Sequence, residues 1–248
     1  MSITVNDLLS RAQTIVQDTT GVFWPFNELL GWFNDARRAV LLANPAAGAS
    51  NEVFRLSPGS YQQLPSDAMT VLRLYRNVQT SSGAFGGSVL RKLPATERQP
   101  GLAVRIVDRH VMDSQLPNWH TMTQATEVVH YMVDESDPTT FYVYPPNDGS
   151  GFVEGAFCRV PDEVTEAVLT QNPDIGIGLP DVFGNAILDY MLFRAYQKNS
   201  NYSASGQRSS DHYALFAGAV GARDVALMAT SPNTDAKESA EEHRTGRI

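Results

Sequence analysis

The stretch WPFNELLGWFNDARR, residues 24–38, combines a helix start, an apolar face and a basic end. Pro25 suits the first helical position, because a proline lacks the N–H that would have no partner there and its φ is already helical. Asn44 precedes Pro45 and is therefore pushed out of the helical region, which ends the helix. The spacing predicts a helix over residues 25–43, and its apolar face consists of Phe26, Leu29, Leu30, Phe33, Ala36 and Val40.

Helical spacing also occurs nearer both ends of the chain. Residues 4–17 carry apolar side chains three and four positions apart, with Thr4 or Asn6 available as a cap. A turn at residues 18–21 would join this helix to the next. Residues 181–198, which Asp181 can cap, and residues 209–228 show the same period, whereas the polar residues 200–210 are typical of a loop. The sequence thus predicts two helices at each end.

Between residues 51 and 160 the apolar period changes from 3.6 to 2, and turn-forming residues interrupt it. VVHYMV and TFYVY flank the turn sequence DESDP and predict a β-hairpin, whose second strand should end at Pro145-Pro146. A short capped helix is predicted over residues 108–115, and an exposed loop over the Gly- and Ser-rich residues 80–88. The predicted strands are residues 52–56, 60–64, 71–78, 89–93, 127–133, 140–144 and 152–159.

These patterns predict an α+β fold with a four-helix bundle core, an inserted antiparallel β-rich domain and an extended C-terminal arm. Residues 1–48 would supply the first two helices, 49–165 the β-rich domain, 166–228 the last two helices and 229–248 the arm. The end of the arm has no aromatic residue and little to bury. It is therefore either a solvated tail or a segment that folds on a partner.

Composition narrows the class of protein. The 248 residues are 42% apolar, and the formal net charge of −8 argues against a protein that holds nucleic acid by neutralising phosphates. Cys158 is the single cysteine, which excludes an intrachain disulfide and fits a reducing cytoplasm. The N-terminus lacks a basic leader, and no apolar run approaches about 18 residues. We expect neither secretion nor a membrane span.

Candidate chemistry is sparse. Asp108, His110 and Asp113 could bring carboxylates near an imidazole, which leaves a hydrolase as an alternative function. Cys158, in a predicted strand, is better explained as a small buried hydrophobe than as a reactive thiolate. The chain shows no nucleophile or phosphate-binding motif, so no catalytic residue is assigned. The five histidines lack the close pairing of zinc ligands, so we predict no metal and no cofactor; they are His110, His120, His130, His212 and His243.

Other conspicuous side chains have simpler explanations. His120 and His130 are expected to pack or lie at the surface. The acidic residues 134–137 lack the spaced ligands and central glycine of a calcium loop and are explained by a hairpin turn. Phe141, Tyr142 and Tyr144 alternate along a strand, and with few basic neighbours they favour core packing or a protein interface over base stacking.

Three stretches carry a family resemblance: WPFNELLGWFNDARR, DRHVMDSQLPNWH and VVHYMVDESDPTTFYVYPP. Together they resemble the bacteriophage head-to-tail connector, or adaptor, proteins. The resemblance spans residues 5–228 and rests on structural motifs, not catalytic ones. It implies a helical core with an inserted β-domain and many copies forming a ring beneath the portal, with a C-terminal arm that reaches the portal surface.

The resemblance implies a non-enzymatic protein of the virion neck, made in the bacterial cytoplasm. A dodecameric ring would join capsid to tail, contact a tail or nozzle protein below and let DNA pass without specific binding. Arg244, Arg247 and Ile248 are the expected portal contacts. Another structural virion role, such as a tail-tube or neck subunit, is the alternative, ahead of a β-domain hydrolase.

Overall fold

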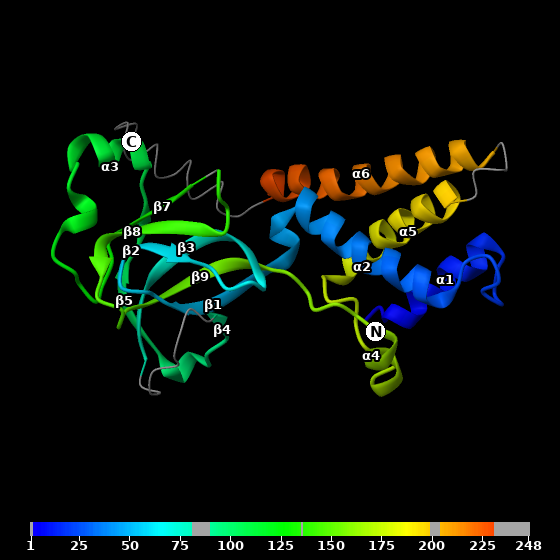
Figure 1. Ribbon diagram of the computed structural model, residues 1–248, viewed down its shortest axis with the longest axis horizontal. Coiled ribbons are helices and arrows are strands. Elements are labelled where there is room, and N and C mark those ends of the chain that lie inside the picture. The colour runs from blue at the N-terminus through cyan, green and yellow to red at the C-terminus, as the bar shows by residue number, and fades with distance from the viewer. Residues whose placement is uncertain (1, 81–89, 135, 199–203, 231–248) are drawn as a thin grey trace. The chain divides into compact units, whose positions relative to one another are not determined.

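The structure is a computed structural model that describes residues 2–80, 90–134, 136–198 and 204–230, with only the backbone of 80, 95 and 222–230 (Figure 1). The chain divides into two compact units. We call Met1–Asn44 with Glu163–Ile248 the helical unit, and Pro45–Asp162 the β unit. The β unit is therefore a continuous segment inserted into the helical one.

The first helix, α1 (Val5–Val16), starts with a capping box. The Thr4 hydroxyl accepts a hydrogen bond from the Asp7 N–H at 3.1 Å, and the Asp7 carboxylate accepts one from the Thr4 N–H at 3.1 Å. This arrangement confirms both the helix over residues 4–17 and the Thr4 alternative for its cap. The helix ends at Gln17, which has a left-handed φ of 60°.

The turn after α1 is organised by one carboxylate. Asp18 accepts hydrogen bonds from the backbone N–H groups of Val22, Phe23 and Trp24 at 3.0, 2.7 and 2.8 Å. The Trp24 bond is the main cause that holds the pKa of Asp18 below its usual value, and it outweighs the opposing effect of burial. The turn therefore enters the next helix in a fixed conformation.

The second helix, α2 (Phe26–Ala43), confirms the prediction from residues 24–38, with Pro25 at the cap position instead of the first turn. Phe26 is 37% exposed, so the buried face begins one turn later than predicted. Trp32 is buried, and the Trp24 indole N–H donates to the Ala195 carbonyl at 3.1 Å. The other predicted face positions are all buried: Leu29, Leu30, Phe33, Ala36 and Val40.

The returning chain is fastened to α2 by a buried asparagine. The Asn34 amide donates to the Val164 carbonyl at 2.9 Å and accepts from the Val164 N–H at 3.1 Å. An exposed ion pair joins Arg38 to Glu163 at 3.6 Å. We call these contacts the clasp. The chain then forms the short helix α4 (Glu166–Gln171), which Thr165 caps.

The remaining helices are α5 (Gly184–Lys198), preceded by the 3₁₀ turn η4 (Asp181–Phe183), and α6 (Ser205–Thr230). The fold is α+β, but the predicted four-helix bundle core is not supported. In place of four helices around a shared core, α5 contacts α1, α2 and α6, and α6 lies along α5 (Figure 1). The described side chains of α6, residues 205–221, give the reason, because Phe216 and Val220 are buried while Tyr213 and Leu215 are half exposed.

The β unit contains two sheets. One has the order β4-β1-β9-β3-β5, and the other the order β2-β8-β7-β6. Pairing between neighbours is antiparallel except between β6 and β7. The strands are β1 (Ala49–Arg55), β2 (Gly59–Gln63), β3 (Ala68–Thr80), β4 (Leu90–Arg91), β5 (Arg98–Ala103), β6 (Arg105–Ile106), β7 (His130–Val133), β8 (Thr140–Asn147) and β9 (Phe152–Arg159).

Both sheets contribute to one apolar core, because alternate residues of each strand point to the same side. Phe54, Phe141 and Phe157 are fully buried in it, and the Phe54 ring meets the Phe141 ring edge-on with centroids 5.7 Å apart. Short connecting elements complete the unit: η1 (Pro45–Gly48), η2 (Ala95–Glu97), α3 (Arg109–Gln115) and η3 (Trp119–Thr121). The hairpin of β7 and β8 confirms the prediction, as does α3.

Several local predictions are wrong. β8 does not end at Pro145-Pro146, because a proline carbonyl still accepts hydrogen bonds and the Pro146 carbonyl takes one from the Ala125 N–H at 2.9 Å. The sequence missed β5, β6 and α4; β5 contains Pro100, which an edge strand tolerates. Residues 205–208, predicted as loop, begin α6, whose start was predicted at Ser209. Residues 81–89 of the predicted exposed loop lie outside the described residues.

Candidate functional site

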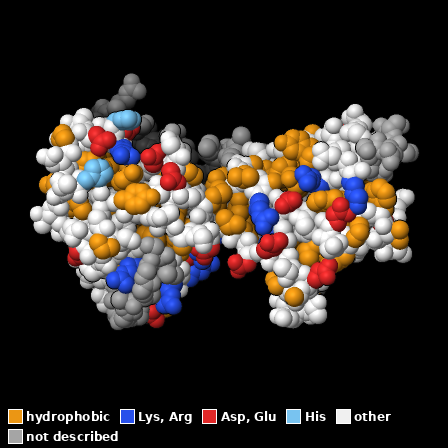
Figure 2. All heavy atoms as spheres, in the orientation of Figure 1, with side chains coloured by type: hydrophobic (Ala, Val, Ile, Leu, Met, Phe, Trp, Pro, Cys, Tyr) orange, Lys and Arg blue, Asp and Glu red, His pale blue; other side chains and the backbone are white. Residues whose placement is uncertain are grey.

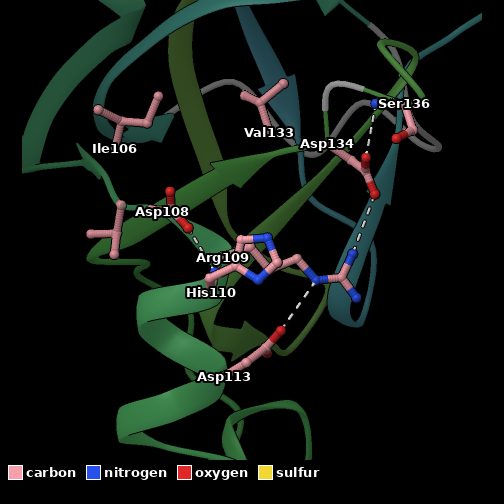
Figure 3. Close-up of a pocket in the computed structure, with 9 residues that line it drawn as sticks. Ile106, Asp108, Arg109, His110, Asp113, Val133, Asp134 and Ser136 are labelled. Atoms are coloured by element: carbon pink, nitrogen blue, oxygen red, sulfur yellow. Dashed lines mark hydrogen bonds and ion pairs between the residues drawn. The ribbon is translucent and has the colours of Figure 1, made fainter.

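A hollow of about 970 Å³ lies beside α3 in the β unit, among the residues of the predicted chemistry (Figure 3). It lies between the start of α3 and the end of β7. Apolar side chains line one part of it, and charged groups from α3 and the hairpin turn line the rest. The lining residues are Ile106, Val107, Asp108, Arg109, His110, Asp113, Val133, Asp134 and Ser136.

The local sequence fixes α3 at the edge of this hollow. Asp108 is extended and its carboxylate accepts a hydrogen bond from the His110 backbone N–H at 2.7 Å, so that it caps the helix. The other end is closed by the Leu116 N–H, which donates to the Met112 carbonyl. Met112 is buried and anchors α3 against the outer face of the second sheet.

Arg109 organises the charges of the hollow. Its guanidinium lies 3.3 Å from Asp134 and 3.7 Å from Asp113, as the dashed lines in Figure 3 show. The same group lies 4.4 Å from the centre of the Tyr142 ring, which favours a cation there. Arg109 therefore ties α3 to the β7–β8 hairpin.

The three residues of the hydrolase alternative lie together, but their carboxylates have structural partners. Asp108 caps the helix. The Asp113 carboxylate accepts a hydrogen bond from the Trp119 indole N–H at 2.8 Å and forms an ion pair with Arg109. His110 is exposed and meets Asp108 through its backbone N–H. The geometry explains these side chains as a cap and an ion-pair network that holds α3 in place.

A second cluster lies next to the hollow. His120 stacks on Trp119 with ring centroids 3.5 Å apart, and its Nδ1 lies 2.8 Å from the Ser60 hydroxyl. Burial is the main cause that lowers the pKa of His120, with a contribution from the Arg109 charge that Asp113 opposes. His120 is exposed while its ring packs on Trp119 and contacts the buried Ser60, which agrees with the packing or surface position predicted for it.

The other sequence candidates also take structural positions. Cys158 is fully buried, and burial raises the pKa of its thiol, which confirms a small buried hydrophobe. Asp137 binds the Thr139 N–H and hydroxyl at 3.2 and 2.6 Å, as a turn residue does. Phe141 is buried in the core, and Tyr142 packs against Trp119. Among the described residues, no group of three metal-ligating side chains comes together.

The predicted portal contacts Arg244, Arg247 and Ile248 lie outside the described residues. Nothing in the described helices reaches the length and apolarity that a membrane crossing requires.

Comparison with known proteins adds one finding. A family model described as SU10 adaptor protein matches residues 3–236. No curated protein matches the chain. The matched range includes the described parts of both the helical unit and the β unit.

Proposed function

Because the chain belongs to the SU10 adaptor protein family, a family of phage head–tail adaptors, we propose that its copies form a ring under the portal that joins capsid to tail. The match over residues 3–236 is the observation that carries this proposal. The neck of the virion is the proposed location, and the protein acts there as a structural component and not as an enzyme. DNA passes through the ring, which is proposed to be dodecameric.

Ring assembly would use heterologous contacts, in which one patch of each copy meets a different patch of the next copy. The exposed side chains of α6, including Tyr213 and Leu215, support the helical unit as one source of such patches. Val22 at the α1–α2 turn, 83% exposed, offers another on the same unit.

We assign portal binding to residues 229–248, and within them to Arg244, Arg247 and Ile248. A polar segment that orders on docking pays its ordering entropy only when the portal is present. Free copies would therefore stay soluble until they meet the portal. The β unit is left to contact the tail or nozzle protein below.

The first test is the mass of the protein by light scattering, alone and with its portal. The full-length chain should join the portal as a ring, whereas a chain that ends at Ala229 should stay apart with unchanged circular dichroism. Arg244→Ala/Arg247→Ala should weaken association at least tenfold, and Lys237→Ala in the same segment serves as the matched control. If the truncated chain assembles as the full-length chain does, the assigned role of the arm is wrong.

A further inference from the structure

The last strand of the second sheet, β6, has an open edge. The Arg105 N–H donates to the Val129 carbonyl at 3.0 Å. The Val107 N–H donates to the Tyr131 carbonyl at 3.0 Å, so both residues pair with β7. Successive residues of a strand direct their backbone groups to opposite sides, and the N–H and C=O of Ile106 therefore point away from β7. Within the described part of the chain, no strand pairs with β6 on that side.

The neighbouring strand β3 is also open where it faces β6. Among the described strands, β5 pairs with β3 only from Arg76 to Thr80. Beyond Val104, whose N–H donates to the Tyr75 carbonyl at 3.0 Å, a hollow of about 370 Å³ lies between β3 and β6. Ile106 lines both this hollow and the one beside α3, so the two meet at β6. The lining residues of the β3–β6 hollow are Leu72, Arg73, Leu74, Val104, Arg105, Ile106 and Tyr131.

The β3–β6 hollow is basic. Arg73 and Arg105 are exposed, and the other side chains that line it are apolar or aromatic. The Arg73 guanidinium lies 5.8 Å from the centre of the Tyr75 ring, which is a contact with a neutral group. Ile106 is 66% exposed and Leu102 is 62% exposed, so the described residues leave this edge accessible.

The hollow beside α3 is acidic. Asp113 and Asp134 share Arg109, the one guanidinium among its lining residues. Asp108 bonds to a backbone N–H, so the three carboxylates leave two excess negative charges. Figure 2 shows acidic, basic and histidine side chains beside hydrophobic ones on the part of the β unit where Figure 1 places α3 and β7. Because Asp108 follows Arg105 along the chain, β6 runs from the basic hollow to the acidic one.

The C-terminal arm carries the matching order of charges. Residues 231–248 lie outside the described residues, but their sequence places four acids and one lysine in 235–242 and two arginines without an acid in 244–247. The 18 residues that follow α6 can extend over about 60 Å. A compact domain of about 100 residues is roughly 35 Å wide, so the arm is longer than such a domain is wide.

We propose that residues 235–248 dock along β6 of the same chain, as an added strand parallel to β6, until the portal is met. In this direction the acidic block lies at the basic hollow and the arginines lie at the acidic one. Glu241 and Arg244 are three residues apart, as are their partners Arg105 and Asp108, so both charge pairs fit one register. Two opposite charge pairs in one register fix the direction of the added strand.

Docking is weak and reversible. The Ile106 N–H and C=O supply main-chain hydrogen bonds, and we expect a dissociation constant on the order of 100 µM for the unlinked arm. Its flexible link gives an effective concentration on the order of 1 mM, so the arm occupies the edge about nine-tenths of the time. The inference rests on the proposed function only for the portal, which offers the arm a tighter site and displaces it.

The test is amide hydrogen exchange of the full-length chain, followed at Ile106 by NMR. A docked arm should slow exchange of the Ile106 N–H about tenfold. Glu241→Lys/Glu242→Lys/Arg244→Glu/Arg247→Glu reverses the order of charges at constant net charge and should remove this protection. The amides of β8, in the interior of the sheet, should exchange alike in both chains and show that the sheet is intact.

Two further variants decide the outcome. Lys237→Glu/Glu238→Lys exchanges charges within the acidic block and should keep the protection within about twofold. Arg105→Glu should remove the protection, and Glu241→Lys/Glu242→Lys in the same chain should restore most of it. Equal exchange of Ile106 in the parent and charge-reversed chains, or an equal loss in the first control, would overturn the proposal. Protection that falls on dilution would assign the arm to a second copy and overturn docking on the same chain.

Portal association separates this inference from the adaptor role. A docked arm is withheld from the portal, so Arg105→Glu should speed portal association up to about tenfold, with the arm itself unchanged. If no chain associates with the portal, the adaptor role fails, whereas Ile106 exchange still decides the docking. If the parent chain joins the portal while Ile106 exchanges as fast as in the charge-reversed chain, the docking fails and the adaptor role stands.

Discussion

Glu154 forms ion pairs with both Arg76 and Arg98 in the first sheet of the β unit. Burial raises the pKa of Glu154, but hydrogen bonds and charges from Arg76 and Arg98 outweigh it and hold the pKa below its usual value. A carboxylate with a lowered folded-state pKa contributes stability above its unfolded pKa and loses it as pH falls through the folded one. The β unit should therefore lose stability as pH falls below about 4.5.

Glu154→Gln should remove this pH dependence and lower the stability of the β unit at neutral pH. The measurement is urea unfolding followed at a series of pH values from 7 down to about 3. Asp67→Asn is the control, because its ion pair with Arg159 is half exposed and should matter little. A Glu154→Gln chain that keeps the acid-dependent loss of the parent would show that another carboxylate causes it.

At the scale of the element, α2 is the best-predicted part of the chain. Its apolar spacing was sufficient to predict a helix over residues 25–43. The observed helix begins one residue later, because Pro25 occupies the N-cap and not the first helical position. The end at Asn44 followed directly from Pro45. Local backbone rules were enough to locate this helix, although its burial against α5 and the Asn34–Val164 hydrogen bonds could not be read from them.

The α2 prediction has a direct test in Trp32, which is 8% exposed. Trp32→Ala should cost about 3 to 5 kcal/mol of unfolding free energy of the helical unit, because it removes a large buried side chain. Leu42→Ala, on the same helix but 76% exposed, should change it by less than about 0.5 kcal/mol. Denaturant unfolding checks both; equal effects of the two changes would mean that α2 does not present the described face.

The sequence did not predict which strands pair with one another. Period 2 located most strands, but it could not say which strands pair, so the two hollows that meet at Ile106 gave no sign in the sequence. The register shifts of β3, between Val71 and Arg73 and between Leu74 and Arg76, are likewise absent from the alternating pattern.

The candidate site was predicted only in part. Asp108 as a cap follows from its position before α3, and Cys158 as a buried hydrophobe follows from its strand. The partners of Arg109 and the Trp119–Asp113 hydrogen bond depend on how the hairpin and η3 fold back, which no local pattern records.

At the scale of the whole molecule, the β unit is continuous in sequence and the helical unit is not. A fragment of residues 45–162 should therefore fold alone, with a single cooperative transition and a strand-rich circular dichroism spectrum. Full-length protein should show this transition together with that of the helical unit. A fragment that remains unfolded would mean that the β core needs the helical unit.

The clasp determines how tension along the chain would reach the inserted β unit. Since Val164 is held by Asn34, tension applied between the two ends of the chain reaches the β unit only after these hydrogen bonds break. While the clasp holds, the chain between Asn34 and Val164, which includes β1–β9, carries no tension. Under such tension the helical unit would bear the load first, and the sheets would be shielded from it.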